Sequence, residues 1–362
     1  MSLNSPAAHS TDNDSSTKMT VWLYAKKAEI NDATFFYLQI IESALRVIGF
    51  KLVNTDTIKE IPWRANILVI DCKRAVEVRL RRPRSKFWLW LQGVVPEEAE
   101  LQFGSKFRKL YWNGFEGFSI PKAQSLFMVS RMMENHYTKK FRLRDIPIFI
   151  MPCVNQRINK AHFATPQKYS QPRFVYAGSM HRWQCIDEML EGFSLVRAKF
   201  PTASLTIYTG DQNSACSIIA SRKVEGVEVD YCPPTKLSHA LAGYKYGFIL
   251  RSSNIVNAVA TPTKVSSYMA AGVIPIMTTA VADFTERLTN VDPILFLNSV
   301  NPEEILSGIS ALEARRFSGE EVYASYSKIF HEYFDLDRYI PAISKLLYGS
   351  LLGKNDLVKL GP

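Results

Sequence analysis

Paired cysteines, long apolar runs and a high content of glycine or proline are all missing from this sequence. The 17 glycines and 18 prolines among 362 residues are too few for a collagen-like or low-complexity chain. No apolar run reaches the ~18–20 residues that a membrane span requires. The five cysteines are scattered without a CxxC pair, which argues against a disulfide scaffold or a zinc cluster and fits a reducing compartment.

The composition is that of a globular protein, with 47% hydrophobic and 12% aromatic residues. At roughly 100–200 residues per domain, the length predicts two domains, each with a core of its own. The first 18 residues are polar and lack the apolar segment of a signal peptide. We therefore expect residues 1–19 to form a disordered leader. We expect the protein to be cytoplasmic, or peripheral at the inner face of the plasma membrane.

The net charge of +10 favours phosphorylated substrates or anionic surfaces as partners. Seven basic residues between Lys73 and Lys86 are opposed only by Glu77, and a second basic cluster spans residues 139–144. One interpretation is a solvated basic face. The other is attraction to an anionic membrane surface, at ~1 kcal/mol per basic residue, through Arg79, Arg81, Arg82 and Arg84. No helix-turn-helix, RRM, KH or zinc-finger pattern accompanies the charge, so we expect no nucleic-acid partner.

Short apolar segments alternate with helical segments along the whole chain. In the first half, the spacing of Phe36, Ile40 and Ala44 predicts a helix over residues 33–48, which Gly49 ends. Six strands are predicted in this half, over residues 20–25, 51–53, 65–71, 86–91, 125–129 and 146–151.

The second half begins after residues 155–171, which are polar, without periodicity, and expected to be a linker. Helices are predicted at 186–200 and 302–314, and two long helices at 320–334 and 337–352. Six further strands are predicted over residues 173–177, 204–208, 227–231, 246–250, 274–278 and 294–297.

Near-continuous apolar strands separated by helices indicate parallel sheets covered on both faces. We therefore predict an α/β fold of two tandem, Rossmann-like, doubly wound domains at residues 20–153 and 154–335, followed by a helical segment at 336–362. In such folds ligands bind outside the carboxyl ends of the strands. Between two facing domains that position is the interdomain cleft.

Two loops after predicted strands could bind an anion. Gly178 lets the backbone approach a phosphate, and the helix after it directs its first N–H groups there, although an ordinary turn glycine is the alternative. In the second loop we expect Thr261 as an N-cap and Pro262 in the first turn of a helix. Thr263 and Lys264 then lie at a helix N-terminus, where dipole, hydroxyl and ammonium converge on an anion.

The run PTKVSSYMAAGVIPI resembles the PTK-l-x-E-Y-l-a-a-G-x-P-V-I segment of GT-B glycosyltransferases, in particular glycosyltransferase family 4. FVYAGSMHRWQCIDEMLEGF is similar to the strand, glycine loop and helix that begin the donor-binding domain of that family. WLQGVVPEEAE, SLFMVSRMMENHY and IPIFIMPCVN resemble members that assemble bacterial polysaccharides. The resemblance covers most of the chain from Thr20 to about Phe334.

The resemblance implies a transferase that moves a sugar from a nucleotide-diphosphate donor, with UDP or GDP expected, and retains configuration without a metal or other cofactor. It places the donor on the second domain and the acceptor on the first, to which the last helix returns. Expected contacts to the donor diphosphate are Gly178, Ser179, Arg182, Arg251, Thr263 and Lys264. Expected contacts to the ribose or sugar are Asn254, Asn257 and Ser267.

The sequence departs from the family pattern at this donor site. The two basic residues that usually follow the glycine are replaced by Ser179 and Gln184. The carboxylate that usually grips the ribose is replaced by Ser267, and its acidic partner by Val259. The positive charge would then come from three other residues, Arg182, Arg251 and Lys264.

The first-domain loop after the predicted strand at 86–91 holds Gln92 and Gly93, which we expect on the acceptor side, followed by Glu97 and Glu98. The two carboxylates could hold acceptor hydroxyls, or one could act as a catalytic base. The alternative is a helix N-terminus, where glutamates simply suit the helix dipole.

These features together predict a bacterial glycosyltransferase that builds a surface polysaccharide or lipooligosaccharide on a glycan or lipid-linked acceptor. Two alternatives stay open. One is a catalytically silent relative that binds a glycan or a partner enzyme. The other is a nucleotide-sugar 2-epimerase of the same fold.

Overall fold

The computed structural model describes residues 20–30 and 32–352, and the predicted leader lies outside these residues. The first half of the chain forms a parallel sheet of six strands in the order β2-β1-β3-β4-β5-β6. Its strands are β1 (Thr20–Tyr24), β2 (Lys51–Thr55), β3 (Asn66–Val69), β4 (Lys86–Trp90), β5 (Leu126–Met128) and β6 (Ile148–Ile150).

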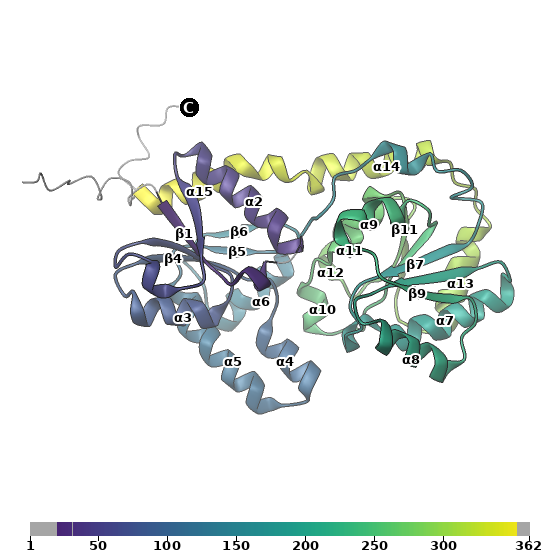
Figure 1. Ribbon diagram of the computed structural model, residues 1–362, viewed down its shortest axis with the longest axis horizontal. Coiled ribbons are helices and arrows are strands. Elements are labelled where there is room, and N and C mark those ends of the chain that lie inside the picture. Colours follow the sequence, from purple (N-terminus) through teal and green to yellow (C-terminus); the bar gives the residue numbers. More distant parts are fainter. Residues whose placement is uncertain (1–19, 31, 353–362) are drawn as a thin grey trace, which may run out of the picture.

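Helices of the first half lie on both sides of this sheet, with α2 above it and α3 and α5 below it in Figure 1. A short 3-10 turn (Lys27–Glu29) follows β1, and another (Ile58–Glu60) follows β2. The α-helices are α2 (Asp32–Val47), α3 (Cys72–Arg81), α4 (Val95–Phe103), α5 (Lys106–Ser119) and α6 (Arg131–Phe141).

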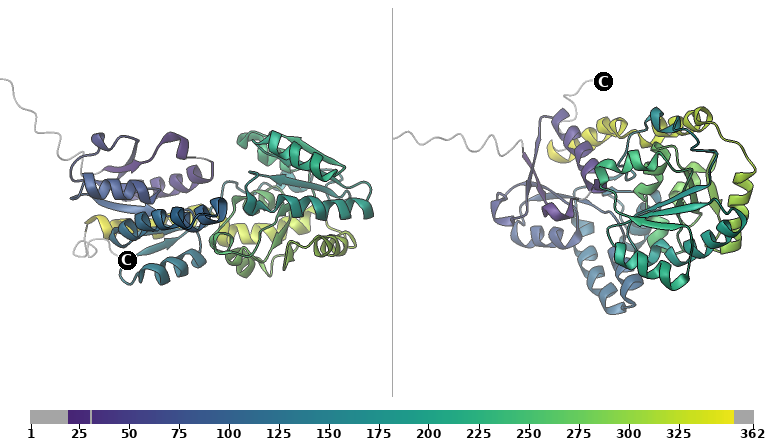
Figure 2. Two further views of the ribbon diagram at one scale, coloured as in Figure 1. Left: turned by 90° about the horizontal axis from the view of Figure 1, so that it is seen from below. Right: turned by 45° about the vertical axis from the view of Figure 1, so that its right-hand side comes forward.

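The second half forms another parallel sheet of six strands, in the order β12-β11-β10-β7-β8-β9. Figure 2 shows the two halves side by side. The strands are β7 (Arg173–Ala177), β8 (Ser204–Tyr208), β9 (Val227–Asp230), β10 (Tyr246–Ile249), β11 (Ile274–Thr278) and β12 (Leu295–Leu297). The fold class predicted from the sequence is confirmed, and all twelve predicted strands are present with ends shifted by at most two residues.

The helices of the second half follow its strands in alternation. A 3-10 turn, η4 (Lys160–Phe163), precedes the sheet, and another, η5 (Arg182–Gln184), follows β7. The α-helices are α7 (Ile186–Lys199), α8 (Gln212–Arg222), α9 (Pro234–Leu241), α10 (Ile255–Val259), α11 (Thr263–Ala270), α12 (Ala282–Leu288), α13 (Pro302–Glu313) and α14 (Gly319–Ile329).

The central strands are buried on both faces, which explains their continuous apolar sequences. In β4 every residue after Lys86 is buried, and all five residues of β11 are buried. Side chains of such strands contact helices on either side of the sheet, so no polar position alternates with the apolar ones.

Each sheet has one point where the strand order reverses. In the first sheet the reversal lies between β1 and β3, and in the second it lies between β7 and β10. Loops that leave two such strands in opposite directions open a crevice at the carboxyl edge of the sheet. In the second sheet those two loops are the ones that begin at Gly178 and at Leu250.

The C-terminal segment returns to the first half, as the sequence predicted (Figure 1). The long helix expected at 320–334 ends earlier, because a π-helical turn (Phe330–Phe334) buries three of its aromatic rings in the second core. The helix expected at 337–352 is a 3-10 turn (Leu336–Tyr339) followed by α15 (Ile340–Leu352). Ile343 and Leu347 of α15 join the first core.

Helix α15 is held on the first half by two hydrogen bonds as well as by packing. The Ser344 hydroxyl donates to the carbonyl of Ala44 at 2.9 Å, and Trp88 Nε1 donates to the Ser350 hydroxyl at 2.9 Å. The last described helix is therefore part of the first core, although the second half separates it in sequence from that core.

Three polar contacts join the two halves near α10. The Ser130 hydroxyl donates to the carbonyl of Val259 at 2.6 Å, and the backbone N–H of Arg131 donates to Asp283 at 3.0 Å. The N–H of Cys153 donates to the Thr261 hydroxyl at 3.2 Å. Because Val259 also packs in the first core, the loop after β10 belongs to both halves.

All five cysteines are free thiols. No helix within the described residues combines the length and hydropathy that a bilayer span would require.

Leu347→Ala tests the return of α15, because it leaves a cavity in the first core. We expect a loss of about 2–5 kcal/mol in the free energy of unfolding, measured by urea titration with tryptophan fluorescence. Five of the six tryptophans lie in the first half, so the signal reports mainly on that half. The control is Leu346→Ala, which truncates a partly buried neighbour. Equal losses in the two variants would contradict the packing of α15.

Candidate functional site

The two loops at the reversal point of the second sheet meet through Gly178 and Lys264. A Cβ atom placed on Gly178 would lie 2.5 Å from Lys264 Cε and 2.6 Å from its Nζ. A side chain at position 178 would therefore displace the lysine. The ammonium also lies 5.0 Å from the centre of the Tyr176 ring and donates to Gln184 Oε1 at 2.8 Å.

Arg251 is the second cation at this point, and its side chain is 6% exposed. Its Nη1 donates to the carbonyl of Trp183 at 3.0 Å, and its Nε has no partner among the described residues. Burial lowers the pKa of Arg251, although the nearby Tyr176 opposes the shift.

Neither Lys264 nor Arg251 is ion-paired among the described residues, although Glu98 lines the same cavity as Arg251. Burial, followed by the positive charge of Arg251, holds the pKa of Lys264 well below its usual range. Two like charges in a poorly solvated place disfavour each other's protonated forms, and an anion between them would relieve both penalties.

The helix that carries Lys264 begins one residue later than the sequence predicted. Thr261 is not its N-cap, because the Thr261 hydroxyl is engaged by the N–H of Cys153. Pro262 occupies the cap position instead and offers no side-chain acceptor, so α11 starts at Thr263. The first N–H groups of α11 therefore lack a side-chain cap.

The other predicted diphosphate contacts lie on the surface of the glycine loop. Ser179 is exposed, and its carbonyl accepts a hydrogen bond from the Tyr176 hydroxyl at 2.5 Å. Arg182 is exposed in η5 and has no partner among the described residues. Neither side chain contacts Lys264.

The predicted sugar contacts are largely engaged within the chain. Asn254 caps α10 by accepting from the N–H of Asn257 at 3.0 Å, and both side-chain amides donate to the carbonyl of Ser252. The Ser267 hydroxyl lies 2.7 Å from Asn155 Oδ1 in the linker. Of the three, Asn257 lines a cavity between the two halves.

That cavity brings the predicted acceptor-side residues to the donor loops. It measures about 130 Å³ and is lined by residues of both halves. The first half contributes Gln92, Gly93 and Glu98, and the second contributes residues that include Trp183, Arg251 and Asn257.

Glu97 and Glu98 have separate environments, and neither is in the loop. Both lie in the first turn of α4. Glu98 Oε1 folds back over Gly93 and accepts from the N–H of Val94 at 3.1 Å, and burial raises the pKa of this carboxyl. Glu97 turns away from the cavity to Lys140, at 3.1 Å.

A second cavity in the first half, of about 270 Å³, contains acidic residues that the sequence analysis missed. Asp71 follows β3, at the reversal point of the first sheet, and Glu116 accepts from the Tyr137 hydroxyl at 2.7 Å. Glu98 lines this cavity too. The position of Asp71 directly after an apolar strand was a usable signal, whereas nothing in the sequence marked Glu116 in mid-helix.

The four arginines of the predicted membrane surface differ in their contacts. Arg82 donates to the carbonyls of Ile58 and Ile61, both at 2.8 Å, and so holds the turn after β2. Arg81 pairs with Glu77, and Arg79 donates to the carbonyl of Pro83 at 2.9 Å. Of these four arginines, Arg84 is the one that has no partner among the described residues.

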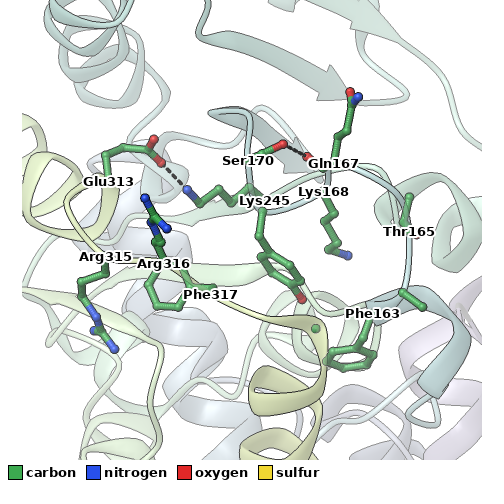
Figure 3. A pocket seen from close by; sticks show the side chains of 13 residues that line it. Phe163, Thr165, Gln167, Lys168, Ser170, Lys245, Glu313, Arg315, Arg316 and Phe317 are labelled. Atoms are coloured by element: carbon green, nitrogen blue, oxygen red, sulfur yellow. Dashed lines mark hydrogen bonds and ion pairs between the residues drawn. The ribbon is translucent and has the colours of Figure 1, made fainter.

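A larger cavity, of about 620 Å³, lies at the opposite edge of the second sheet, next to the start of β10 (Figure 3). Its charged groups are mostly engaged. Lys245 and Glu313 point toward each other with Nζ 2.6 Å from Oε1, and Arg315 pairs with Asp292. Buried Lys168 donates to the carbonyl of Ala271, at the C-terminal end of α11, and burial lowers its pKa to about 7. The charged residues around this cavity therefore have a structural role, because they pair with one another or bind the backbone of neighbouring elements.

The sequence matches no protein-family model and no curated protein. The structure is similar to sucrose-phosphate synthase from Thermosynechococcus elongatus, with a TM-score of 0.67 and 10% identity over 92% of this chain and 100% of that chain. It is also similar to a glycosyltransferase from Rickettsia africae, with a TM-score of 0.61 and 11% identity over 91% and 98% of the chains.

A third similar structure is a TarM variant from S. aureus in complex with fondaparinux, α-GlcNAc-glycerol and UDP, with a TM-score of 0.62 and 11% identity. The match covers 82% of this chain but spans only 57% of the TarM chain. These likenesses show the fold. The chain has the GT-B fold, in which two Rossmann-like halves face each other.

Lys264→Met tests whether the half-buried ammonium lacks a counter-ion. Because the folded pKa of Lys264 is lowered, the unfolded chain binds more protons between the two pKa values, and the wild-type fold loses stability as pH falls through that window. We expect the stability of the variant relative to wild type to rise as pH falls below about 10, the usual pKa of lysine, measured by urea unfolding. The matched control is Lys236→Met on exposed α9, which should show no such gain. An identical pH dependence in wild type and K264M would contradict the assignment.

Proposed function

We propose that this chain is a glycosyltransferase that moves a sugar from a nucleotide-diphosphate donor to a glycan or lipid-linked acceptor. The observation that carries the proposal is the pair of basic side chains Lys264 and Arg251, neither of them ion-paired among the described residues, at the reversal point of a parallel sheet. A diphosphate supplies the missing negative charge. The similarity to a glycosyltransferase and to a UDP-bound structure supports this choice of ligand.

In this proposal the diphosphate lies over Gly178, against Lys264 and the uncapped N-terminus of α11. Helix N-termini and lysines both favour phosphate oxygens. Exposed Arg182 is free to reach the ligand from the side of the glycine loop. The leaving diphosphate is then neutralised by basic side chains and backbone N–H groups, which is the basis for a metal-independent reaction. UDP is the first donor class to test and GDP the second.

The acceptor enters from the first half, where Glu98 lines both the 270 Å³ cavity and the cavity between the halves. Its carboxyl can accept a hydrogen bond from an acceptor hydroxyl while Oε1 stays near the N–H of Val94. Asp71 and Glu116 offer further acceptors for sugar hydroxyls in the same cavity. A polyhydroxylated acceptor fits this set of oxygen atoms.

Donor binding requires the two halves to move apart. The cavity between them measures about 130 Å³, whereas small-molecule sites usually measure about 300–1,000 Å³. The junction consists of a few hydrogen bonds near α10 and the packing of Val256 and Val259 against the first core, which such a motion would have to break.

We further propose that the reaction retains configuration and serves surface polysaccharide or lipooligosaccharide assembly at the inner face of the membrane. This part rests on the sequence resemblance and on the basic surface that includes Arg79 and Arg84. A catalytically silent relative is the second candidate. Two hydrogen bonds favour it, because they already use groups that a donor would need. The Lys264 ammonium donates to Gln184, and the Ser267 hydroxyl donates to Asn155.

Nucleotide binding is tested by thermal unfolding in the presence of UDP, GDP, CMP and dTDP. A ligand at ~100 times its dissociation constant stabilises the folded state by ~2.7 kcal/mol, so a shift is readily measured. We expect a shift with UDP that Lys264→Ala abolishes and Lys236→Ala preserves. The absence of a shift with all four nucleotides would favour the silent relative. A full shift in K264A would place the diphosphate elsewhere.

Glu98→Gln tests the acceptor site separately from the donor site. We expect transfer to the acceptor to fall by about 100-fold or more, with the UDP shift unchanged. Since the pKa of Glu98 is raised, wild-type activity should fall as pH drops through that raised value, and the glutamine variant should lack this acidic limb. Glu100→Gln on the same helix is the control. If the two variants are equally active, Glu98 has no role in transfer.

A further inference from the structure

The helical hairpin formed by α4 and α5 concentrates exposed apolar side chains. Figures 1 and 2 show the two helices projecting from one side of the first half. Eleven large apolar side chains are exposed among the described residues, and five of them belong to this hairpin. They are Val95, Phe103, Phe107, Leu110 and Tyr111.

Helix α5 has its apolar stripe on the solvent side. Phe107, Leu110 and Tyr111 follow the i, i+3, i+4 spacing of one helix face, and Phe107 is 87% exposed. The buried residues of α5 are two polar ones, Glu116 and Ser119. In an ordinary surface helix the apolar stripe faces the core, so this face is built to be covered by something else.

The charges around the stripe are all of one sign. The sequence from Leu101 to Phe115 contains three basic residues and no acidic one. Lys106 and Arg108 are exposed, and the Arg108 guanidinium lies 4.0 Å from the centre of the Phe103 ring. Lys109 is paired with Glu100 at 2.6 Å. The surface thus combines aromatic rings with positive charge.

We propose that the apolar tip, defined here as Phe103, Phe107, Leu110 and Tyr111, inserts into the interface of an anionic lipid bilayer. Apolar and aromatic side chains flanked by lysine and arginine are typical of helices that lie in a membrane interface. Protein–protein interfaces are depleted of lysine, which makes a protein partner the less suitable occupant. Insertion covers the apolar side chains while the basic groups face lipid phosphates.

The hairpin also joins this surface to the acceptor side of the cleft. Helix α4 starts just after Gln92 and Gly93, which line the cavity between the halves, and ends at Phe103. Eight residues of helix rise about 12 Å. An acceptor anchored in the bilayer would therefore need a polar head group about 12 Å long to span the distance from the apolar tip to the cleft. This last step rests on the proposed function, whereas membrane binding itself does not.

The test is co-sedimentation of the full chain with vesicles, without donor or acceptor, so that its outcome is independent of transferase activity. We expect binding to phosphatidylcholine vesicles that contain phosphatidylglycerol and little binding to pure phosphatidylcholine. The double variant Phe107→Ser, Leu110→Ser should bind the anionic vesicles at least about tenfold more weakly, with an unchanged melting temperature because both side chains are exposed.

The control is Phe35→Ser, Val47→Ser, which removes two exposed apolar side chains of α2 on the first half. It should bind like wild type. Charge reversal at Arg79, in α3, and at Arg84, just after α3, measures the contribution of these arginines to binding for comparison with that of the hairpin. Equal binding by wild type and the hairpin variant would overturn the proposal, as would an equal loss in the control. Failure of wild type to bind either vesicle would also overturn it and leave a protein partner for this face.

Discussion

The candidate site of the second half is organised around two basic side chains, half-buried Lys264 and buried Arg251, whose positive charges act on each other. Arg251 and Lys264 lie at the two ends of the segment that connects β10 to α11. Gly178 has no side chain and so leaves the space that the lysine side chain occupies. Lys264 lies on the helix that this connection enters, and Arg251 lies just after the strand that it leaves. Strand reversal between β7 and β10 opens the crevice where these groups meet. A fold selected for stability alone would place an apolar residue or a carboxylate there, which is the reason for the proposal of an anionic ligand at this point.

Hydrogen bonds along α11 hold Lys264 in place. Near its N-terminal end Gln184 accepts from the Lys264 ammonium, and in its middle Asn155 engages Ser267. At its C-terminal end, Lys168 and Tyr169 donate to the carbonyls of Ala271 and Gly272. Most of these partners come from the polar linker, whose lack of periodicity reflects its role in hydrogen bonding to a helix. The linker thus positions the proposed donor site as well as connecting the halves.

The strands and the location of the site could be predicted from the sequence because both depend on local patterns. Buried parallel strands such as β11 read as continuous apolar segments, and Gly178 and Lys264 stand at the points where strands and helices meet. The hydrogen-bond partners could not be predicted, because they are set by contacts between distant segments. Thr261 is engaged by Cys153, which is distant in sequence. Asn254, by contrast, caps α10 through a local contact that its position before the helix could have indicated. Glu97 and Glu98 are adjacent in sequence, yet the helix turn directs them to different environments.

Helix α4 unites the three surfaces that a membrane-bound acceptor would need. Its first turn carries Glu98 at the cleft, its buried face supports the network of Lys140 and Glu116, and its last residue begins the exposed apolar tip. A rigid helix transmits position along its length, whereas a flexible loop between membrane and cleft would not fix the distance. Lys140 lies 3.1 Å from Glu97 and 2.8 Å from Glu116, so it ties α4 to α5 and α6. These ion pairs therefore connect the hairpin to the helix that carries Lys140, so the hairpin does not depend on apolar packing alone for its position next to the cleft.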